Sequence, residues 1–320
     1  MTKQLDQEDM RWLPSCDRSA MRARAQMYAD IRAFFAERSV LEVETSVLSQ
    51  YATTDVHIQS IQAGNRFLHT SPEFAMKRLL AAGSGCIYQI CKAFRQEETG
   101  RKHNTEFSML EWYRVGFDHI QLMAEVDKFM QTILGCPAAE QISYQQLFLK
   151  TVNIDPLQRD LQQLQQYVVA SGILASEPYD LDYDTLLHLV FSHQIEPALG
   201  QHKPVLVYGY PASQSALAKI NADDERIADR FELYYKGVEL ANGFNELTNS
   251  TEQAARFEHD NTQRQAAGLP TMPADINLIA ALSNGLPNCA GVALGLDRLL
   301  MLKLGVSHIH EVIAFPNEIA

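Results

Sequence analysis

The sequence contains no long apolar run. Among its 320 residues, no apolar stretch approaches the roughly 18–20 residues that a bilayer-spanning helix requires. The N-terminal segment, MTKQLDQEDMRW, is too polar for a signal peptide. We therefore expect a cytoplasmic protein that has no membrane partner.

Paired cysteines are also absent. The sequence has five cysteines, and no two of them form a CxxC pair. An odd number without metal-type spacing argues against a disulfide framework and against a zinc site. We expect buried, reduced cysteines, and for Cys289 packing is a better explanation than catalysis.

Basic residues are scarce relative to acidic residues. The 27 Lys and Arg residues face 39 Asp and Glu residues, which gives a net charge of −12. Broad, non-specific nucleic-acid binding depends on Lys and Arg neutralising phosphates, so this class is disfavoured, although a local basic patch is not. The hydrophobic fraction of 46% and the charged fraction of 21% are ordinary for a globular protein with a large core.

Hydrophobic periodicity predicts a mixture of helices and strands. Apolar side chains recur at helical spacing after Ser19, at Met21, Ala25, Tyr28, Ile31 and Phe35. The β-branched run 40–49 predicts a single strand. Further strands are predicted at 67–70, 86–94, 108–114, 205–210, 231–235, 238–241 and 290–294, and further helices at 74–83, 120–134, 252–267 and 297–304.

The length allows one large domain or two average ones, and no repeat or flexible linker divides the chain. We expect an N-terminal lead-in at 1–18, followed by one domain at 19–320. Residues 141–201 are Gln-rich and helical in character, with Leu157, Leu161 and Leu164 at spacings of three and four. This segment is predicted to be an insertion that lies against the main sheet.

Two stretches carry side chains suited to nucleotide chemistry. The first, Phe94–Tyr113, contains Arg95, Glu97, Asn104 and Phe107, and the second ends at Arg298 after the Gly-containing run GVALGLD. Arginine offers a planar fork of donors to phosphate oxygens, and carboxylates can hold a metal or an amine. Alone, a charged pair at a strand end is usually a solvated rim. Together these residues indicate attack of a carboxylate on ATP, which gives an acyl-adenylate.

Two further carboxylates, Glu239 and Glu246, lie seven residues apart with Asn242 and Gly243 between them. We expect Gly243 to bend the chain so that the two carboxylates converge. Mg²⁺ bound to ATP phosphates needs only one or two protein carboxylates. Two glutamates in such a region usually have no function. The surrounding pattern ELANGFNEL favours a functional pair here.

The stretch Phe94–Tyr113 resembles motif 2 of the class II aminoacyl-tRNA synthetases, and Gly291–Leu302 resembles motif 3. Within that class the chain is similar to lysyl-tRNA synthetases and, more closely, to their short paralogues, the ligases that attach beta-lysine to elongation factor P. The resemblance extends from about Met21 to Phe315. It implies an α+β fold, namely a class II catalytic domain with a mainly antiparallel sheet flanked by helices. It also implies a homodimer, whose interface motif 1 would build, although Ser46 replaces the usual proline of that motif.

The resemblance implies roles for the ATP-binding residues. Arg95 would bind the α-phosphate and the substrate carboxylate, Arg298 the γ-phosphate, and Phe107 would stack on adenine. Glu97 would meet the adenine amino group, in a loop where Thr105 replaces a common proline. The whole implied ATP set is Arg95, Gln96, Glu97, Asn104, Phe107, Glu239, Leu240, Gly295 and Arg298, with Arg95 and Arg298 as the catalytic pair.

The implied substrate set also has a structural interpretation. Ser71-Pro72-Glu73 has the composition of a helix N-terminus, with Ser71 as the cap and Pro72 at the first helical position. Without the resemblance, Glu111 and Tyr113 would be interpreted as residues on an ordinary, half-exposed strand face. By resemblance, the amino-acid pocket consists of Ser71, Pro72, Glu73, Glu111, Tyr113, Glu246 and Ala293. Glu239 is the candidate ligand for Mg²⁺, and Glu246 either binds substrate or shares the metal.

Two departures from the lysyl-tRNA synthetases bear on the substrates. Ala293 replaces a common glycine, and one added methyl can shift substrate choice by roughly 1–3 kcal/mol, which points to a beta-amino acid unless the change is neutral. Motif 1 begins near Met21, so we expect no N-terminal anticodon-binding barrel and no tRNA substrate.

The expected reaction is activation of (R)-beta-lysine or L-lysine as an adenylate, followed by transfer to the ε-amine of a lysine on elongation factor P. The alternatives are a minimal aminoacyl-tRNA synthetase, an ammonia-using asparagine synthetase relative and a non-catalytic regulatory subunit. Glu111, Tyr113 and Glu246 favour a cationic substrate over aspartate. Retention of both motif arginines disfavours the regulatory subunit.

Overall fold

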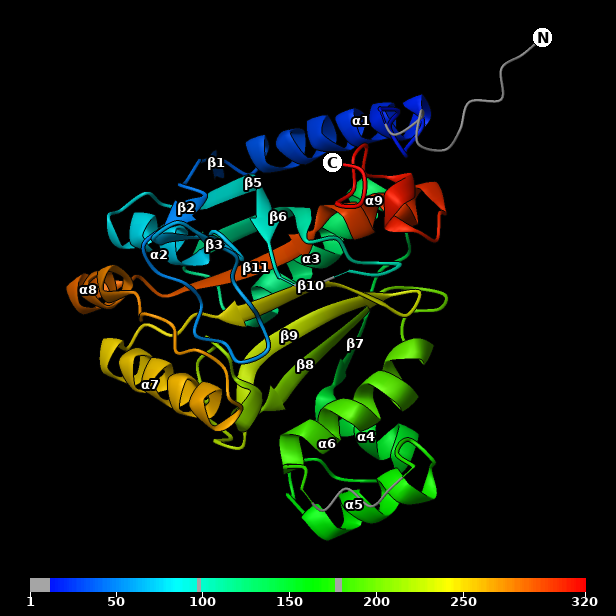
Figure 1. Ribbon diagram of the computed structural model, residues 1–320, viewed down its shortest axis with the longest axis vertical. Helices are drawn as coiled ribbons and strands as arrows, with labels where there is room; N and C mark the ends of the chain where they lie inside the picture. Colours follow the sequence, from blue (N-terminus) through cyan, green and yellow to red (C-terminus); the bar gives the residue numbers. More distant parts are fainter. Residues whose placement is uncertain (1–11, 97–98, 176–179) are drawn as a thin grey trace. The chain divides into compact units, whose positions relative to one another are not determined.

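The structure is a computed structural model that describes residues 12–96, 99–175 and 180–320 (Figure 1). The chain divides into two compact units. The first unit comprises Met1–Tyr113, Asn249–Pro287 and Ala293–Ala320, and the second comprises Arg114–Thr248 and Asn288–Val292. Strand β11 (Cys289–Gly295) contributes residues to both units.

The first unit begins with helix α1 (Arg18–Ala36), whose N-terminus is capped by Asp17 through a 2.8 Å bond from the Ala20 N–H. The helix was correctly predicted, but its buried face was only partly predicted. Met21 and Ala25 are exposed. The buried residues of the helix are Ala20, Met27, Ile31, Phe34 and Phe35.

The prediction of one strand over 40–49 is wrong. The segment forms two separate two-residue strands, β1 (Leu41–Glu42) and β2 (Leu48–Ser49). β1 pairs in parallel with β5, whereas β2 pairs with β4 (Arg66–Leu68) in a small sheet that β3 (Gln62–Ala63) completes. The β-branched composition favoured extended backbone, but the choice between partners depends on segments distant in sequence.

The pair of long strands in the first unit was predicted. β5 (Ile87–Phe94) runs antiparallel to β6 (Glu106–Val115), with Gln89 opposite Glu111 and Ala93 opposite Phe107. On one face of this pair, Phe35 of α1 stacks on Tyr88 at a ring separation of 4.3 Å and meets Trp112 at 5.4 Å. That face is the core, so the alternate residues of β6 are available for a site on the other face.

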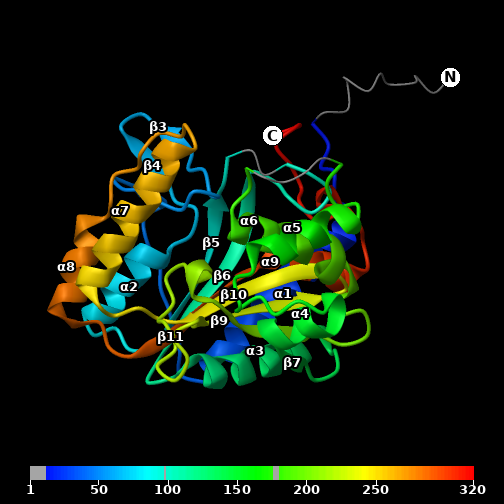
Figure 2. The ribbon, with the colours of Figure 1, turned by 90° about the horizontal axis from the view of Figure 1, so that it is seen from below.

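Helices α2 (Glu73–Ala81), α7 (Ser250–Ala266) and α8 (Ile276–Gly285) lie beside one another in the first unit (Figures 1 and 2). Phe74 of α2 packs against Phe257 of α7. Helix α8 was not predicted from sequence. Helix α9 (Leu296–Leu304) follows β11, and Gly305 is its C-cap. This order matches the last predicted strand–helix pair.

The second unit contains four strands in the order β10-β9-β8-β7. β7 (Glu140–Ser143) is parallel to β8 (Val205–Pro211), and β9 (Ile227–Tyr235) is antiparallel to both β8 and β10 (Val238–Asn245). The predicted turn at Lys236-Gly237 has positive φ at both residues, 52° and 65°. This left-handed backbone matches the tight turns that join twisted hairpin strands.

The helices of the second unit are α3 (His119–Leu134), α4 (Tyr144–Val152), α5 (Leu161–Ala170) and α6 (Tyr183–Val190). The last three lie close together (Figure 2). In the core that they enclose, Tyr144 stacks on Phe191 and packs against Tyr210 of β8. The predicted apolar spacing around α5 is partly wrong. Leu157 precedes the helix and Leu161 is exposed, because α5 begins at Leu161 after the Asp160 cap.

The expected mainly antiparallel α+β fold is confirmed. All five cysteines are free thiols, but the expectation that they are buried holds only for Cys16 and Cys289, since Cys86, Cys91 and Cys136 are half-buried. Across the described part of the chain, no helix combines the length and the apolar composition needed to cross a membrane.

Candidate active site

Strand β6 presents three predicted site residues on one face. Phe107, Glu111 and Tyr113 are separated by even numbers of residues, so their side chains emerge on the face opposite Trp112. Although that face is the polar side of the strand pair, Glu111 and Tyr113 are each only 2% exposed. The sequence therefore places a carboxylate and a phenol in a buried setting, where each needs hydrogen-bond partners.

Glu111 is held by two hydroxyl groups. The Tyr113 hydroxyl donates to Oε1 and the Ser71 hydroxyl donates to Oε2, both at 2.6 Å. Ser71 lies 40 residues before Glu111, so only the fold brings them together. The two hydroxyl groups orient the buried carboxylate, and a carboxylate is the kind of acceptor that suits an ammonium.

The predicted cap at Ser71-Pro72-Glu73 is shifted by one residue. Helix α2 begins at Glu73 with Pro72 as its N-cap, while the Ser71 oxygen still accepts the Glu73 N–H at 3.0 Å. Ser71 thus joins the helix start to Glu111.

Glu73 has a cationic partner within its own helix. The Lys77 ammonium, which is 1% exposed, lies 2.7 Å from Glu73 Oε1. A buried ammonium requires such a carboxylate. Glu73 therefore meets a cation within its own helix.

Burial and the charge of Glu111 raise the pKa of the neighbouring Cys91 thiol to about 12. The thiol therefore stays protonated near neutral pH and is a poor nucleophile. This argues against a catalytic role for Cys91.

Arg95 follows the last residue of β5, so it lies at the end of the strand rather than within it. Its N–H donates to Thr105 O at 3.0 Å, and its guanidinium carbon lies 5.1 Å from the Phe107 ring centroid. A guanidinium over an aromatic face is a favourable arrangement, and both groups are half-buried. The predicted phosphate ligand and the predicted adenine platform are therefore neighbours. Glu97 lies outside the described residues.

Asn104 is a buried residue of the loop between β5 and β6. It is 4% exposed, its amide donates to Glu106 O at 2.6 Å, and its oxygen accepts the Asn317 N–H at 3.1 Å. These bonds favour a role in holding the loop against the C-terminal segment.

Arg298 lies in the first turn of α9, as predicted. Its guanidinium donates to His103 Nε2 at 2.5 Å and to Lys102 O at 3.3 Å. Both partners come from the loop between β5 and β6. The His103 ring therefore lies directly against the Arg298 guanidinium.

Sequence reasoning missed Asp297, which precedes Arg298. Its buried carboxylate accepts the Ser108 N–H at 2.6 Å and pairs with Arg24 of α1. An acidic residue in the first turn of a helix was a signal available in the sequence. Asp297 fixes the start of α9 against β6 and α1.

Ala293 and Gly295 share the less buried face of β11, between the buried residues Val292, Leu294 and Leu296. A Cβ atom at Gly295 would lie 3.8 Å from the Arg298 Cδ atom, which is an ordinary contact. Gly295 leaves the surface beside the Arg298 stem open.

The remaining predicted residues belong to the second unit. Glu239 is half-buried opposite Tyr234, Leu240 is 3% exposed, and Glu246 is 1% exposed. The Glu246 N–H donates to Cys289 O at 3.0 Å. Because the Leu240 side chain is in the core, only its backbone is available to a nucleotide.

The expectation that Gly243 bends the chain is wrong. Pairing with β9 is continuous from Ala241 to Phe244, and the register shift falls between Glu239 and Ala241. A Cβ atom at Gly243 would lie 2.6 Å from the Phe231 ring and 3.0 Å from Val292 Cβ. Glycine is required there because its neighbours occupy the space of a side chain.

A second group that sequence reasoning missed precedes Glu246. Asn245 donates to Asp229 Oδ2 at 2.9 Å, and Asn221 donates to Asp229 Oδ1 at 2.7 Å. These bonds fix the end of β10 immediately before Glu246.

The candidate metal ligands are the carboxylates of Glu239 and Glu246. Within residues 12–96, 99–175 and 180–320, no group of three or more His, Cys, Asp or Glu side chains could hold a metal ion. Glu239 and Glu246 supply at most two carboxylates, and Mg²⁺ bound to phosphates needs no more. These residues fit Mg²⁺–ATP better than a permanent metal centre.

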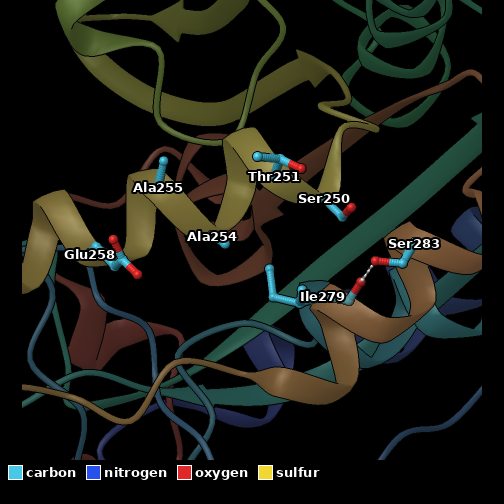
Figure 3. Close-up of a pocket in the computed structure, with 7 residues that line it drawn as sticks. All are labelled: Ser250, Thr251, Ala254, Ala255, Glu258, Ile279 and Ser283. Carbon is cyan, nitrogen blue, oxygen red and sulfur yellow. Dashed lines mark hydrogen bonds between the residues drawn. The ribbon is translucent and has the colours of Figure 1, made fainter.

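A shallow groove of about 460 Å³ lies between α7 and α8 (Figure 3). None of the predicted site residues lines it. Its lining residues are mostly small, namely Ser250, Thr251, Ala254, Ala255, Glu258, Ile279 and Ser283.

Comparisons with known proteins identify the family of the chain. The family model described as "tRNA synthetases class II (D, K and N)" matches residues 3–319. A protein of Vibrio vulnificus (strain YJ016) named elongation factor P–(R)-beta-lysine ligase is 54% identical over 319 residues, covering 97% of this chain and 99% of the relative. The protein of the same name from Vibrio cholerae serotype O1 is 54% identical over 315 residues, covering 95% of this chain and 97% of the relative. The chain thus belongs to the class II tRNA synthetase family that comprises the D, K and N enzymes.

Proposed function

We propose that the protein is an ATP-dependent ligase that activates (R)-beta-lysine, or lysine, and transfers it to the ε-amino group of a lysine on elongation factor P. The observation that carries the proposal is the buried Glu111 carboxylate with its two hydroxyl partners, because it suits a substrate ammonium. The names of relatives that match nearly the whole chain support the same protein acceptor. Class II membership supports ATP as the second substrate.

In the first step, a carboxylate oxygen of the amino acid attacks the α-phosphorus of ATP. An oxygen–phosphorus bond forms, the bond to the β-phosphate oxygen breaks, and pyrophosphate leaves. Arg95 stabilises the negative charge that builds on the α-phosphate, and Arg298 holds the γ-phosphate. For Arg298 to do so, its bonds to His103 and Lys102 must give way to phosphate.

In the second step, the unprotonated ε-amine of the acceptor lysine attacks the acyl carbon. A carbon–nitrogen bond forms, the acyl–oxygen bond to AMP breaks, and the amine loses one proton. The chain needs no covalent nucleophile, since positioning and charge stabilisation suffice.

Glu239 and Glu246 would hold Mg²⁺, with Glu246 serving the substrate if the metal needs only one carboxylate. The ion would neutralise phosphate charge when bound.

We also propose a homodimer that acts in the cytoplasm, where translation takes place, and that does not charge tRNA. The motif 1 segment exposes Met21, Leu41 and Leu48, which are 40%, 57% and 45% exposed. Apolar side chains gathered in one segment suit an interface between copies. The net charge of −12 disfavours a large tRNA-binding surface.

The test is the intact mass of elongation factor P after incubation with the protein, Mg-ATP and either (R)-beta-lysine or L-lysine, with tRNA charging measured in parallel. We expect one lysyl addition, larger with the beta isomer, and no charged tRNA. Charged tRNA without modified protein would identify a minimal synthetase instead. Inactivity in both assays would favour the non-catalytic subunit.

Site variants make the test specific. Arg95→Ala and Arg298→Ala should each lower ATP–pyrophosphate exchange by about 10²-fold or more, since each removes charge stabilisation from the transition state. Arg226→Ala is the matched control, because this arginine is exposed and pairs only locally with Asp224. Unchanged exchange in either site variant would refute the assignment.

A further inference from the structure

One irregular segment of the first unit is unusually well buried. Residues 52–60 form neither helix nor strand, yet Ala52, Thr54 and Ser60 are 5%, 1% and 7% exposed. Buried backbone groups outside regular structure must find partners elsewhere. The segment supplies some of its own, since the Gln59 amide donates to Val56 O at 3.1 Å.

Helix α7 supplies the other partners through Arg264. This arginine is 0% exposed. Its Nη1 atom donates to Asp55 O at 2.7 Å and its Nη2 atom to Gln59 Oε1 at 2.9 Å. Its Nε atom donates to Pro270 O at 2.8 Å. One turn earlier, Asp260 accepts the Thr54 hydroxyl at 2.6 Å.

The same segment touches the candidate site. The Gln59 carbonyl accepts the N–H of Gln96 at 2.9 Å. Gln96 directly follows Arg95, whose own N–H donates to Thr105 O. The backbone of Arg95 is therefore held by two consecutive bonds, one of which ends on the segment that Arg264 orders.

We infer that Arg264 is a positioning residue for Arg95. It orders residues 55–59, and the Gln59 carbonyl then fixes the backbone from which the Arg95 side chain reaches the α-phosphate. The planar fork of arginine suits this task, because one side chain donates to three separate oxygens. Lysine cannot reproduce the geometry. The role of Arg95 itself rests on the proposed function.

Hydrogen exchange in the ligand-free protein tests the positioning directly. In Arg264→Met we expect faster amide exchange in the peptide that spans 55–59 and also in the peptide that carries Gln96. Gln263→Met is the control, since Gln263 lies on the same helix, is exposed and bonds His259 one turn away. Unchanged exchange at Gln96 in Arg264→Met would overturn the inference.

Kinetics test the consequence, at a temperature where circular dichroism shows each variant fully folded. Arg264→Met should lower kcat/KM for ATP in pyrophosphate exchange by about ten- to hundredfold, and Arg264→Lys should not restore it. A merely structural role would lower the melting temperature and leave the kinetic constants of the folded enzyme unchanged.

Gln59→Ala keeps the test decisive if Arg264→Met folds poorly. This substitution removes one acceptor of Arg264 but keeps the backbone carbonyl that accepts the Gln96 N–H. We therefore expect a smaller decrease in kcat/KM for ATP than in Arg264→Met. The double variant Gln59→Ala/Arg264→Met should have nearly the same kcat/KM for ATP as Arg264→Met alone. A decrease equal to the product of the two single decreases would contradict the inference. Absence of exchange activity in the unsubstituted protein would refute the proposed function, while hydrogen exchange would still decide the positioning.

Discussion

Glu111 is a buried carboxylate in the proposed substrate pocket. It is nearly inaccessible to water, yet two hydroxyl groups donate to it, and Lys77 already neutralises the other nearby candidate, Glu73. A carboxylate that is desolvated and oriented in this way attracts an ammonium more strongly than an exposed one would. Removal of the Glu111 charge is therefore expected to weaken recognition of the lysine substrate.

Replacing Glu111 by Gln should selectively weaken lysine recognition. The amide removes the charge and points a donor at a hydroxyl, so we expect kcat/KM for lysine to fall by about ten- to hundredfold, the value of a hydrogen bond to a charged group. KM for ATP should change little. Amino-acid-dependent pyrophosphate exchange measures both constants. Glu106→Gln is the control on the same strand, because Glu106 is exposed and pairs with Lys92. Equal constants in the two variants would contradict the assignment.

Buried histidines should make the fold sensitive to acid. Burial lowers the pKa of His69 below 6.5, although its ring donates to Lys92 O at 2.6 Å, and burial also lowers the pKa of His119. Between the lowered pKa values and 6.5 the unfolded chain binds more protons, so the free energy of unfolding rises with pH in that window. This stability is fully present above pH 6.5 and is lost as the pH falls.

The measurement is the melting temperature between pH 7.5 and pH 5.5. We expect it to fall with acidification in the unsubstituted protein and to fall less in His69→Gln, which keeps a donor for Lys92 O. The exposed His202 gives the matched control, His202→Gln. A pH profile that His69→Gln leaves unaltered would rule out this source of acid sensitivity.

Among the elements, β10 shows how a strand can be adapted to its neighbours. It carries Glu239 near one end and leads to Glu246 at the other, and Gly243 lies between them in continuous pairing with Phe231. Glycine at position 243 leaves room for the Phe231 ring of the paired strand. The glycine is needed for packing rather than for chain flexibility.

Gly243→Ala should therefore destabilise the second unit by overpacking. The added methyl group would lie 2.6 Å from a ring that is 0% exposed and cannot move freely. We expect a loss of about 1–3 kcal/mol in the free energy of unfolding by urea. Phe231→Leu should relieve part of this loss, so the double variant should be less destabilised than the sum of the single variants. An unaltered urea midpoint in Gly243→Ala would show that the site has spare room.

At the scale of the whole molecule, the proposal requires the motif 1 segment to meet a second copy of the chain. Leu41→Asp should convert a dimer to a monomer, because a charge would be buried without a partner at the interface. Multi-angle light scattering measures the change. Leu149→Asp is the matched control, since Leu149 is also an exposed leucine but lies on α4. A monomeric unsubstituted protein would exclude the homodimer.

The sequence by itself determined the features that depend on local pattern. The period of two in β6 predicted that Glu111 and Tyr113 share a face, and apolar spacing predicted α1 and α3. The two motif stretches indicated the family and the candidate site. A β-branched run also showed that 40–49 is extended, but not that it divides between two sheets.

Only the tertiary structure decided which distant groups meet. Ser71 with Glu111, Arg298 with His103 and Arg264 with Gln59 are separated by 40, 195 and 205 residues. No periodicity specifies such pairs, because they form only when the packed core fixes the elements that carry them. Buried polar atoms then take whichever partner lies within about 3 Å, and that geometry is a property of the folded chain.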